Sequence, residues 1–389
     1  MSDPIFSLID HWRKVDGALG DWIHPDDRSV LSSPRWSGKV RWDVPADQRE
    51  VIREHLRQPS RLQAGLIPQP YLGDLRSADI VLCLLNPGVD PSNYLSERKG
   101  SEARRQKLAT LHQHMDDLAS PFYPVDPEVA NTGAFGWWWP RFVKLAEPLM
   151  DEGLSFDESM QTLSRRIACV EIVPYHSRNG DPISASMIAA LPSSRLAIDC
   201  VRYKAEQGAQ VILFRSHASW GLKDDGEHIR IATDATRSIV LGKATQAGQI
   251  IKRRLRPDPR SLTSFQPLFE RLEGAFGEWR GGERVDDGAL QMPCYELSEA
   301  ATEFVDGCYS GGWILGGFPW PDWIQSEEGI RLRTDPSALH AAGYFHLAKL
   351  LTALVRADRF SDGTLAQAFE SNLIQRIIDR AVALAEAGR

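Results

Sequence analysis

The chain has 389 residues, an apolar fraction of 42% and a formal net charge of -7. This length exceeds that of one typical domain, so we expect two domains and an N-terminal extension. The negative charge excludes a globally basic nucleic-acid-binding protein but leaves room for a local basic surface.

The five cysteines are not spaced as metal ligands. Because no Cys-x-x-Cys pair occurs, a zinc or iron–sulfur centre is not expected, and we expect no other cofactor. The N-terminus lacks a signal-peptide pattern, and no apolar run reaches the ~18 residues of a membrane span. These features predict a reduced, cytoplasmic protein that does not interact with membranes.

Residues 1–60 predict a helical extension. Apolar side chains recur at helical spacing from Phe6 to Trp12, and residues 48–56 predict a second helix. A loop over residues 61–77 then leads to the first strand.

The run from Ile80 to Leu85 is continuously apolar and stops at Asn86-Pro87-Gly88. Such a run predicts a strand buried on both faces, as in a parallel sheet covered by helices. Ligands of open parallel sheets bind beyond the carboxyl ends of the strands. Asn86 therefore stands where an active site is expected, although the same three residues would also serve an ordinary turn.

Further apolar runs predict strands over residues 167–174, 209–214 and 238–241. Helical patterns over residues 97–118 and 193–207 separate the first three of the four strands. Residues 61–256 therefore predict one α/β domain with a mainly parallel sheet. The charge run of the first helix is read mainly as a solvated face.

Polar clusters close three of these strands, at Asn86, at residues 171–178 and at residues 215–217. We expect them to converge at one edge of the sheet. Glu171 stands inside an apolar run, where an unpaired carboxylate is costly, so it must face a polar pocket or a basic partner. Residues 137–139 are three adjacent tryptophans, of which at least one should face a cleft or a neighbouring domain.

The stretch Leu85-Asn86-Pro87-Gly88 resembles the first motif of the uracil-DNA glycosylase superfamily, and is closest to the Gly-x-Asn-Pro-Gly motif of its mismatch-specific branch. Further stretches follow in the order of the family. Residues 135–149 resemble its aromatic segment, residues 170–173 its base-reading strand, and residues 211–221 its strand and turn containing Ser-His-Ala. The resemblance covers residues 66–256 and implies a three-layer α/β/α fold with a mainly parallel central sheet.

The sequence departs from this family at three places. Leu84 stands where the opening Gly is expected, and Glu171 replaces the base-reading Asn. The late His-Pro-Ser motif is absent, and a turn over residues 242–248 takes its place.

The resemblance implies a monofunctional DNA glycosylase, a hydrolase that flips a base out of the duplex, cleaves its N-glycosidic bond and leaves an abasic site. Asn86 would orient the water, and His217 or Lys243 would donate a hydrogen bond to the base anion, although His217 could equally serve the turn. The residues expected to bind the base are Glu171, Tyr94, Trp137, Pro87 and Gly88. The residues expected to bind DNA are Arg215, Lys243, Lys252, Arg253 and Arg254.

Glu171 carries the prediction about the substrate. A carboxylate only accepts hydrogen bonds, so it suits an exocyclic amine such as cytosine N4 and repels uracil O4 and unprotonated cytosine N3. We therefore expect a modified, cytosine-type base, and defence against foreign DNA such as phage DNA fits this substrate. Two alternatives remain open: a conventional uracil or mismatch repair glycosylase, and an inactive DNA-binding module on the same fold.

Residues 257–284 predict a linker with one helix, and residues 285–389 predict a separate, mostly helical domain. Its two long helical patterns cover residues 336–357 and 365–387. The tryptophan-rich segment near Trp313 and the stretch Leu350–Phe360 resemble a bacterial domain of uncharacterised function. Its protein partner is unknown, and dimerisation, a lid and partner docking stay open as its role.

Overall fold

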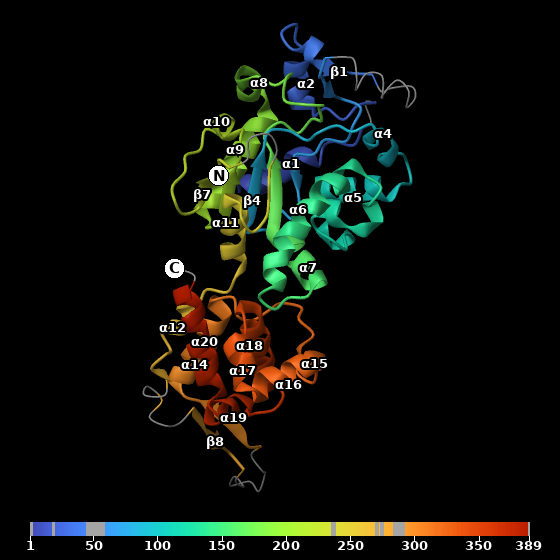
Figure 1. Ribbon diagram of the computed structural model, residues 1–389. Helices are drawn as coiled ribbons and strands as arrows, with labels where there is room; N and C mark the ends of the chain where they lie inside the picture. Colours follow the sequence, from blue (N-terminus) through green and yellow to red (C-terminus); the bar gives the residue numbers. More distant parts are fainter. Residues whose placement is uncertain are drawn as a thin grey trace, which may run out of the picture. The chain divides into compact units, whose positions relative to one another are not determined.

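The computed structural model of the chain describes residues 3–17, 20–43, 59–234, 239–268, 272, 276–282 and 292–387. The chain divides into two compact units. Unit 1 comprises Met1–Glu147 and Phe156–Arg254, and unit 2 comprises Pro148–Ser155 and Leu255–Arg389. Each unit has a hydrophobic core of its own, and the colours of Figure 1 follow the chain through both.

Unit 1 is built on a five-stranded sheet of order β3-β5-β4-β6-β7. The strands are β3 (Tyr71–Leu72), β4 (Ile80–Leu84), β5 (Ile167–Glu171), β6 (Gln210–Leu213) and β7 (Ile229–Ile231). β3 runs antiparallel to β5, whereas the other three pairings are parallel. The predicted α/β class is therefore confirmed, with a mixed sheet. A smaller parallel pair joins β1 (Val40–Arg41) to β2 (Leu62–Gln63).

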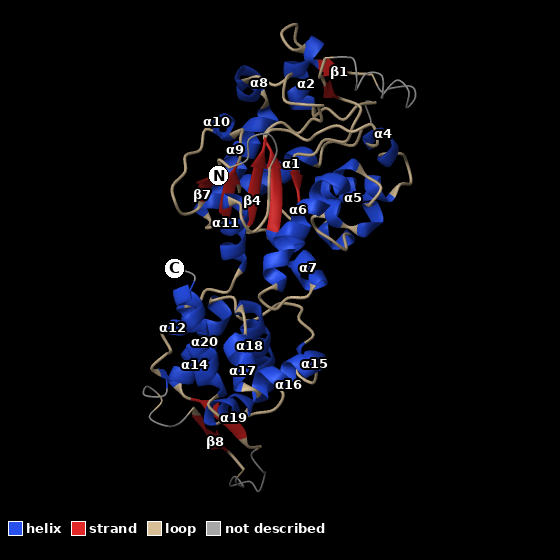
Figure 2. Ribbon diagram, viewed as in Figure 1, coloured by secondary structure: helices blue, strands red, loops and turns tan. Residues whose placement is uncertain are grey.

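Helices surround this sheet (Figure 2). The helices of unit 1 are α1 (Pro4–Trp12), α2 (Pro25–Leu31), α4 (Asn93–Ser96), α5 (Glu102–His112), α6 (Gly133–Met150), α7 (Phe156–Arg166), α8 (Ala185–Ala190), α9 (Pro192–Glu206), α10 (His217–Trp220) and α11 (Gln246–Leu255). Short 3-10 turns are η1 (Ser37–Lys39), η2 (Met115–Asp117), η3 (Tyr123–Val125) and η4 (Pro127–Val129). α6 and α11 end beyond the last residues assigned to unit 1.

Both faces of the sheet are buried, as the continuous apolar runs predict. Val81 and Cys83 on β4 pack in one core cluster with residues of α1 and α9. Successive side chains of a strand point to opposite faces, so Leu82 faces the other side, where it is also fully buried.

The strand predicted over residues 238–241 is wrong. Residues 239–241 are not in a strand, and residue 238 lies outside the described residues. The outer strand is β7, whose half-buried Ile-Arg-Ile pattern is typical of an edge strand rather than of a covered one. The Ile239 carbonyl instead accepts a hydrogen bond from Arg141 Nε at 3.0 Å.

The helix predicted over residues 97–118 is shorter in the structure, where α5 covers Glu102–His112 and α4 ends before the predicted range, at Ser96. Gly100 adopts φ +82°, which breaks the helical path, and the Ser101 hydroxyl then caps α5 by accepting a hydrogen bond from the Arg104 N–H. α5 stops at Gln113, which is left-handed at φ 55°. The helix predicted over residues 48–56 lies outside the described residues.

The N-terminal segment is fastened to unit 1 by a buried polar contact. The Asp27 carboxyl at the start of α2 is fully buried and accepts hydrogen bonds from the Tyr175 hydroxyl at 2.7 Å and the Ser193 N–H at 3.1 Å. The Tyr175 hydroxyl in turn accepts from the His24 N–H at 3.2 Å. This contact joins α2 to the segment that follows β5 and to the first turn of α9.

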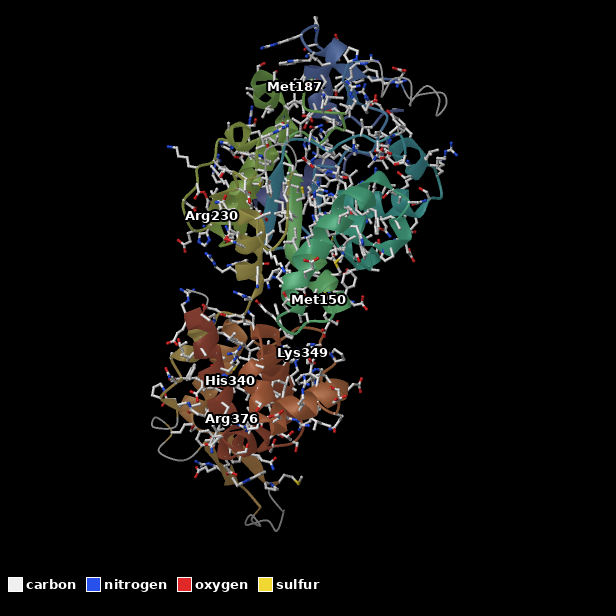
Figure 3. The ribbon with its side chains drawn as sticks, in the orientation of Figure 1. Met150, Met187, Arg230, His340, Lys349 and Arg376 are labelled. Atoms are coloured by element: carbon white, nitrogen blue, oxygen red, sulfur yellow. The ribbon has the colours of Figure 1, made fainter. Side chains whose placement is uncertain are left out.

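Unit 2 is mostly helical, as predicted for residues 285–389. Its helices are α12 (Arg260–Thr263), α14 (Glu299–Ser310), α15 (Trp320–Trp323), α16 (Glu327–Thr334), α17 (Pro336–Ala341), α18 (Tyr344–Asp358), α19 (Thr364–Glu370) and α20 (Leu373–Ala387). Lys349 belongs to α18 (Figure 3). Its side chain is buried, and its Nζ lies 3.8 Å from Glu328 Oε2. The sequence did not predict the antiparallel pair β8 (Gly277–Arg280) and β9 (Cys294–Leu297).

Each long helical pattern of unit 2 is interrupted once. α17 and α18 are separated at Gly343, where a Cβ would lie 2.7 Å from the Glu152 Cα, so a side chain there would displace the Glu152 backbone. α19 and α20 are separated at Asn372, which is left-handed at φ 58°. Among the described residues, no helix combines the length and the apolar character that crossing a bilayer requires.

We predict that Tyr175→Phe loosens the N-terminal segment. The substitution removes one donor to the buried Asp27 carboxyl and the acceptor of the His24 N–H, which should cost about 1–3 kcal/mol of local stability. Hydrogen–deuterium exchange of the full chain should show faster exchange in α1 and α2. Tyr203→Phe on α9 is the matched control, since no hydrogen bond of its hydroxyl occurs within the described residues; equal protection in the two variants would contradict the prediction.

Candidate functional site

The segments that follow β4 and β5 continue side by side beyond the ends of the strands. Leu84 is opposite Glu171 in the last register position of the parallel pair. Beyond it, the Ser177 N–H donates to the Pro87 carbonyl and the Val89 N–H donates to the Ser177 carbonyl, both at 3.1 Å. This pairing brings Asn86 and Glu171 to the same edge of the sheet.

A cavity of about 280 Å³ lies at this edge. Five residues of the predicted site line it: Asn86, Pro87, Gly88, Trp137 and Glu171. Residues that the sequence did not assign to the site also line it, among them Gln69, Asp90, Asn93, His176 and Arg178. The volume is at the lower end of the range for small-molecule sites and equals that of about nine liquid waters.

The Asn86 amide is held in one orientation. Its Nδ2 donates to Ser177 Oγ at 2.8 Å, to the Pro87 carbonyl at 3.1 Å and to the Tyr175 carbonyl at 3.2 Å. Ser177 Oγ can accept this bond because its own hydrogen is donated to the Asn179 carbonyl. Within the described residues no donor reaches Asn86 Oδ1, which is therefore available to accept a hydrogen bond from a ligand or a water.

Glu171 is buried in the wall of the cavity, and one of its carboxyl oxygens has no hydrogen-bond partner among the described residues. Glu171 is only 3% exposed, and the oxygen without a partner is Oε2. Burial raises the pKa of this carboxyl well above its ordinary value of 4.5, since no nearby cation offsets the loss of solvation. Glu171 is therefore a neutral acid at pH values where an exposed glutamate is ionised, and it presents one donor and one acceptor.

His176 fastens the turn that carries Asn86. Its buried ring places Nδ1 2.7 Å from the Gly88 carbonyl and Nε2 3.1 Å from the Ile67 carbonyl. Burial and the nearby Lys107 lower the pKa of His176 to about 3, so the ring is neutral and has a single N–H.

Trp137 offers a flat surface at the start of α6. The Arg141 guanidinium lies 3.8 Å from the centre of its ring, which is a close cation–π contact, and Trp138 meets it edge-on at 4.6 Å. Of the three adjacent tryptophans, Trp137 and Trp138 line the cavity, whereas Trp139 stacks on Phe135 at 4.9 Å.

Seven predicted site residues lie outside the cavity wall, and four of them are Tyr94, His217, Arg215 and Lys243. The Tyr94 hydroxyl donates to Gln63 Oε1 at 2.7 Å. His217 begins α10, where its backbone N–H donates to the Phe214 carbonyl at 2.8 Å. Arg215 and Lys243 are exposed in the turns after β6 and before α11. Because β6 is parallel to β4, Arg215 and His217 still follow the same edge of the sheet as Asn86.

The basic residues Lys252, Arg253 and Arg254 are in the last turn of α11 and belong to the opposite edge. Arg254 Nε donates to Asp79 Oδ2 at 3.0 Å, and Asp79 directly precedes β4. The five residues of β4 span about 17 Å between this edge and the Asn86 turn. The structure therefore does not bring these three residues to the cavity.

Ser177 and His176 are the positioning residues that sequence reasoning missed. Both belong to the polar stretch after β5, which the sequence marked as a strand end without assigning roles. The sequence feature that could have identified them is a set of polar side chains directly after a buried strand. In the structure His176 and Ser177 are both at most 2% exposed.

Within the described residues, His11, His24 and Asp26 form a group whose ligand atoms lie within 4.8 Å of one another. The two imidazole rings are stacked with their centres 3.4 Å apart, so their lone pairs run nearly parallel rather than converging on one ion. His24 Nδ1 already accepts a hydrogen bond from the Asp26 N–H at 3.1 Å. This geometry suits helix capping better than metal binding.

Residues 255–387 match the model of a family of unknown function (DUF6508). These residues belong to unit 2, so the match describes that unit and not the cavity of unit 1. No curated protein and no solved structure matches the chain significantly.

We predict that Glu171→Gln stabilises unit 1 at neutral and alkaline pH. The raised pKa means that the folded chain binds a proton which the unfolded chain releases above pH 4.5, so stability falls as pH rises from that value towards the folded pKa. The amide does not titrate and avoids this loss. Scanning calorimetry should show a higher Tm for the variant at about pH 8, by roughly 2–4 °C for each kcal/mol gained in the free energy of unfolding. The difference in Tm should be smaller near pH 4.5.

Glu206→Gln is the control for this measurement, because Glu206 is exposed on α9. A Tm difference between Glu171→Gln and the unmodified chain that stays constant with pH would show that the Glu171 carboxyl titrates normally.

Proposed function

We propose that unit 1 is a monofunctional DNA glycosylase of the uracil-DNA glycosylase type, with a three-layer α/β/α arrangement, that acts in the cytoplasm. It would take a flipped nucleotide into the cavity beside Asn86, hydrolyse the N-glycosidic bond and leave an abasic site. The sequence resemblance over residues 66–256 is the starting point of this proposal, and the geometry of the cavity supports it.

The observation that carries the proposal is the fixed orientation of Asn86. Three oxygens hold its Nδ2, so Oδ1 is the atom left to accept a hydrogen from a water in the cavity. An amide is a weak base, so its contribution is to align the water with the anomeric carbon while the sugar gains positive charge. Most of the acceleration must then come from stabilising the departing base.

The cavity wall also suits a flat heterocycle. Trp137 supplies a stacking surface, and the edge of the base would meet Glu171. Phosphates beside the flipped nucleotide would meet Arg178, which lines the cavity, and Arg215, which follows the same edge of the sheet. Lys252, Arg253 and Arg254 are too distant for the nucleotide at the cavity and would contact DNA only farther along the duplex.

The neutral state of Glu171 changes the argument about the substrate. An ionised carboxylate would repel uracil O4, whereas a neutral acid can pair with the N3–H and O4 of uracil or with the N3 and N4 amine of cytosine. Hydrogen bonding alone therefore permits both bases. We retain a modified cytosine-type base, in foreign DNA such as phage DNA, as the proposed substrate, and a conventional uracil or mismatch glycosylase as the first alternative.

The second alternative is a DNA-binding module without activity. The absent His-Pro-Ser motif favours it, and so does the position of His217 outside the cavity wall. The two readings differ in whether abasic sites form, since both expect salt-dependent DNA binding.

We predict that Asn86→Ala lowers base release by about 100-fold or more while leaving DNA binding unchanged, because the substitution removes the acceptor that aligns the water. The assay measures alkali-sensitive strand breaks and identifies the freed base, using duplexes with a single cytosine, C5-substituted cytosine or uracil, and modified phage DNA. Asn131→Ala, at an exposed position, is the matched control. DNA binding without base release from any of these substrates would favour the inactive module.

Ser177→Ala tests whether the hydrogen bond from Asn86 to Ser177 is needed to orient the Asn86 amide. The variant removes the shortest acceptor of Nδ2 but leaves the backbone pairing with Pro87 and Val89 in place. We expect a loss of about 10-fold in kcat with little change in KM, since the amide can then rotate away from the water. An unchanged kcat would mean that the carbonyl acceptors alone hold the amide.

A further inference from the structure

Among the described residues that line the cavity, Glu171 is the one with a buried side-chain oxygen, Oε2, that has no hydrogen-bond partner. It ends β5 at the register position of Leu84, directly before the turn that carries Asn86. Its Oε2 has no hydrogen-bond partner in the described structure, although buried polar groups are almost always paired. A carboxyl left in this state at a cavity points to a ligand group that completes it.

The surroundings of Glu171 do not stabilise a negative charge. Burial raises the pKa of the neighbouring Cys83 and Cys169 thiols, which stay neutral, and lowers that of His176 to about 3. The charged side chains that line the cavity are Asp90 and Arg178, both exposed. Burial among these groups therefore favours the protonated form of Glu171 over the ionised form.

We propose that Glu171 is a general acid that protonates a basic ring nitrogen of the departing base, so that the enzyme selects bases in which such a nitrogen lies beside an exocyclic amine, as N3 lies beside N4 in cytosine. This inference rests on the proposed glycosylase function and names its substrate class. The carbonyl oxygen of the neutral acid accepts a hydrogen bond from the amine while its hydroxyl donates to the ring nitrogen.

The atoms and charges of this step balance. The bond between C1′ and N1 breaks and its electron pair stays on N1, while the Glu171 proton moves to N3, so the base leaves as a neutral molecule. The water oxygen bonds to C1′, and the proton that this water loses returns through the cavity to the Glu171 carboxylate. No cofactor takes part in the step.

Uracil cannot use this acid in the same way. Its N3 already carries a hydrogen, so it must leave as an anion that is stabilised by hydrogen bonds alone. General-acid catalysis contributes about 10²–10⁴-fold, and this contribution is available only to bases with a free ring nitrogen. Protonation by the acid therefore distinguishes cytosine-type bases from uracil, although hydrogen bonding to Glu171 permits both.

The test compares the full chain with Glu171→Gln in single-turnover base release across pH, on duplexes carrying cytosine, C5-substituted cytosine or uracil. Glutamine keeps one donor and one acceptor but cannot release a proton. We expect the unmodified chain to lose activity on the cytosine-type base as pH rises through the titration of Glu171. The variant should release the base about 100-fold more slowly or worse, and its rate should not fall as pH rises. Glu206→Gln should behave as the unmodified chain.

A second measurement is independent of activity. In protein labelled with ¹³C at the glutamate carboxyl, the resonance missing from Glu171→Gln identifies this residue, and its shift should report a neutral acid at pH 7. An ionised carboxylate there would overturn the proposal.

The possible failures are distinguishable. Release of a cytosine-type base at an unchanged rate by Glu171→Gln, or release of uracil only, would overturn the role of Glu171 and leave the glycosylase in place. Absence of base release from every substrate, including modified phage DNA, would remove the glycosylase and this inference with it.

Discussion

The site depends on the pairing of the two segments that leave β4 and β5. Ser177 is central to it, because its N–H and carbonyl bind Pro87 and Val89 while its hydroxyl accepts from Asn86. A backbone pairing therefore sets the distance between the segments, and one side chain sets the orientation of the amide. A parallel sheet makes this possible, since neighbouring strands end at the same edge and their continuations can extend the ladder outward.

Successive residues of the same segment serve different parts of unit 1. The Tyr175 hydroxyl donates to Asp27 in the N-terminal segment, His176 binds the Gly88 carbonyl, and Ser177 holds Asn86. Tyr175 and Ser177 do not line the cavity, whereas His176, whose ring nitrogens both contact carbonyl oxygens, and Glu171, whose Oε2 has no partner within the described residues, both line it. The buried carboxyl is retained at a cost in stability that the rest of the unit offsets.

The match to a known family concerns unit 2 and not the cavity of unit 1. The family match covers residues 255–387 and names no activity, so it places no constraint on the cavity of unit 1. The proposed glycosylase rests on the sequence motifs and on the geometry of Asn86 and Glu171. Unit 2 has its own core, organised around the buried helix α18.

The sequence by itself determined the α/β class, the three central strands and the polar residues at their ends, because continuous apolar runs and abrupt polar stops are local properties of the chain. It also placed Asn86 and Glu171 at one edge. Only the tertiary structure decided that His217 and Tyr94 lie outside the cavity, that Arg254 belongs to the opposite edge, and that burial raises the pKa of the Glu171 carboxyl. The reason is physical: a strand follows from its own residues, whereas the solvation of a carboxyl and the partners of a side chain are set by segments far away in the sequence.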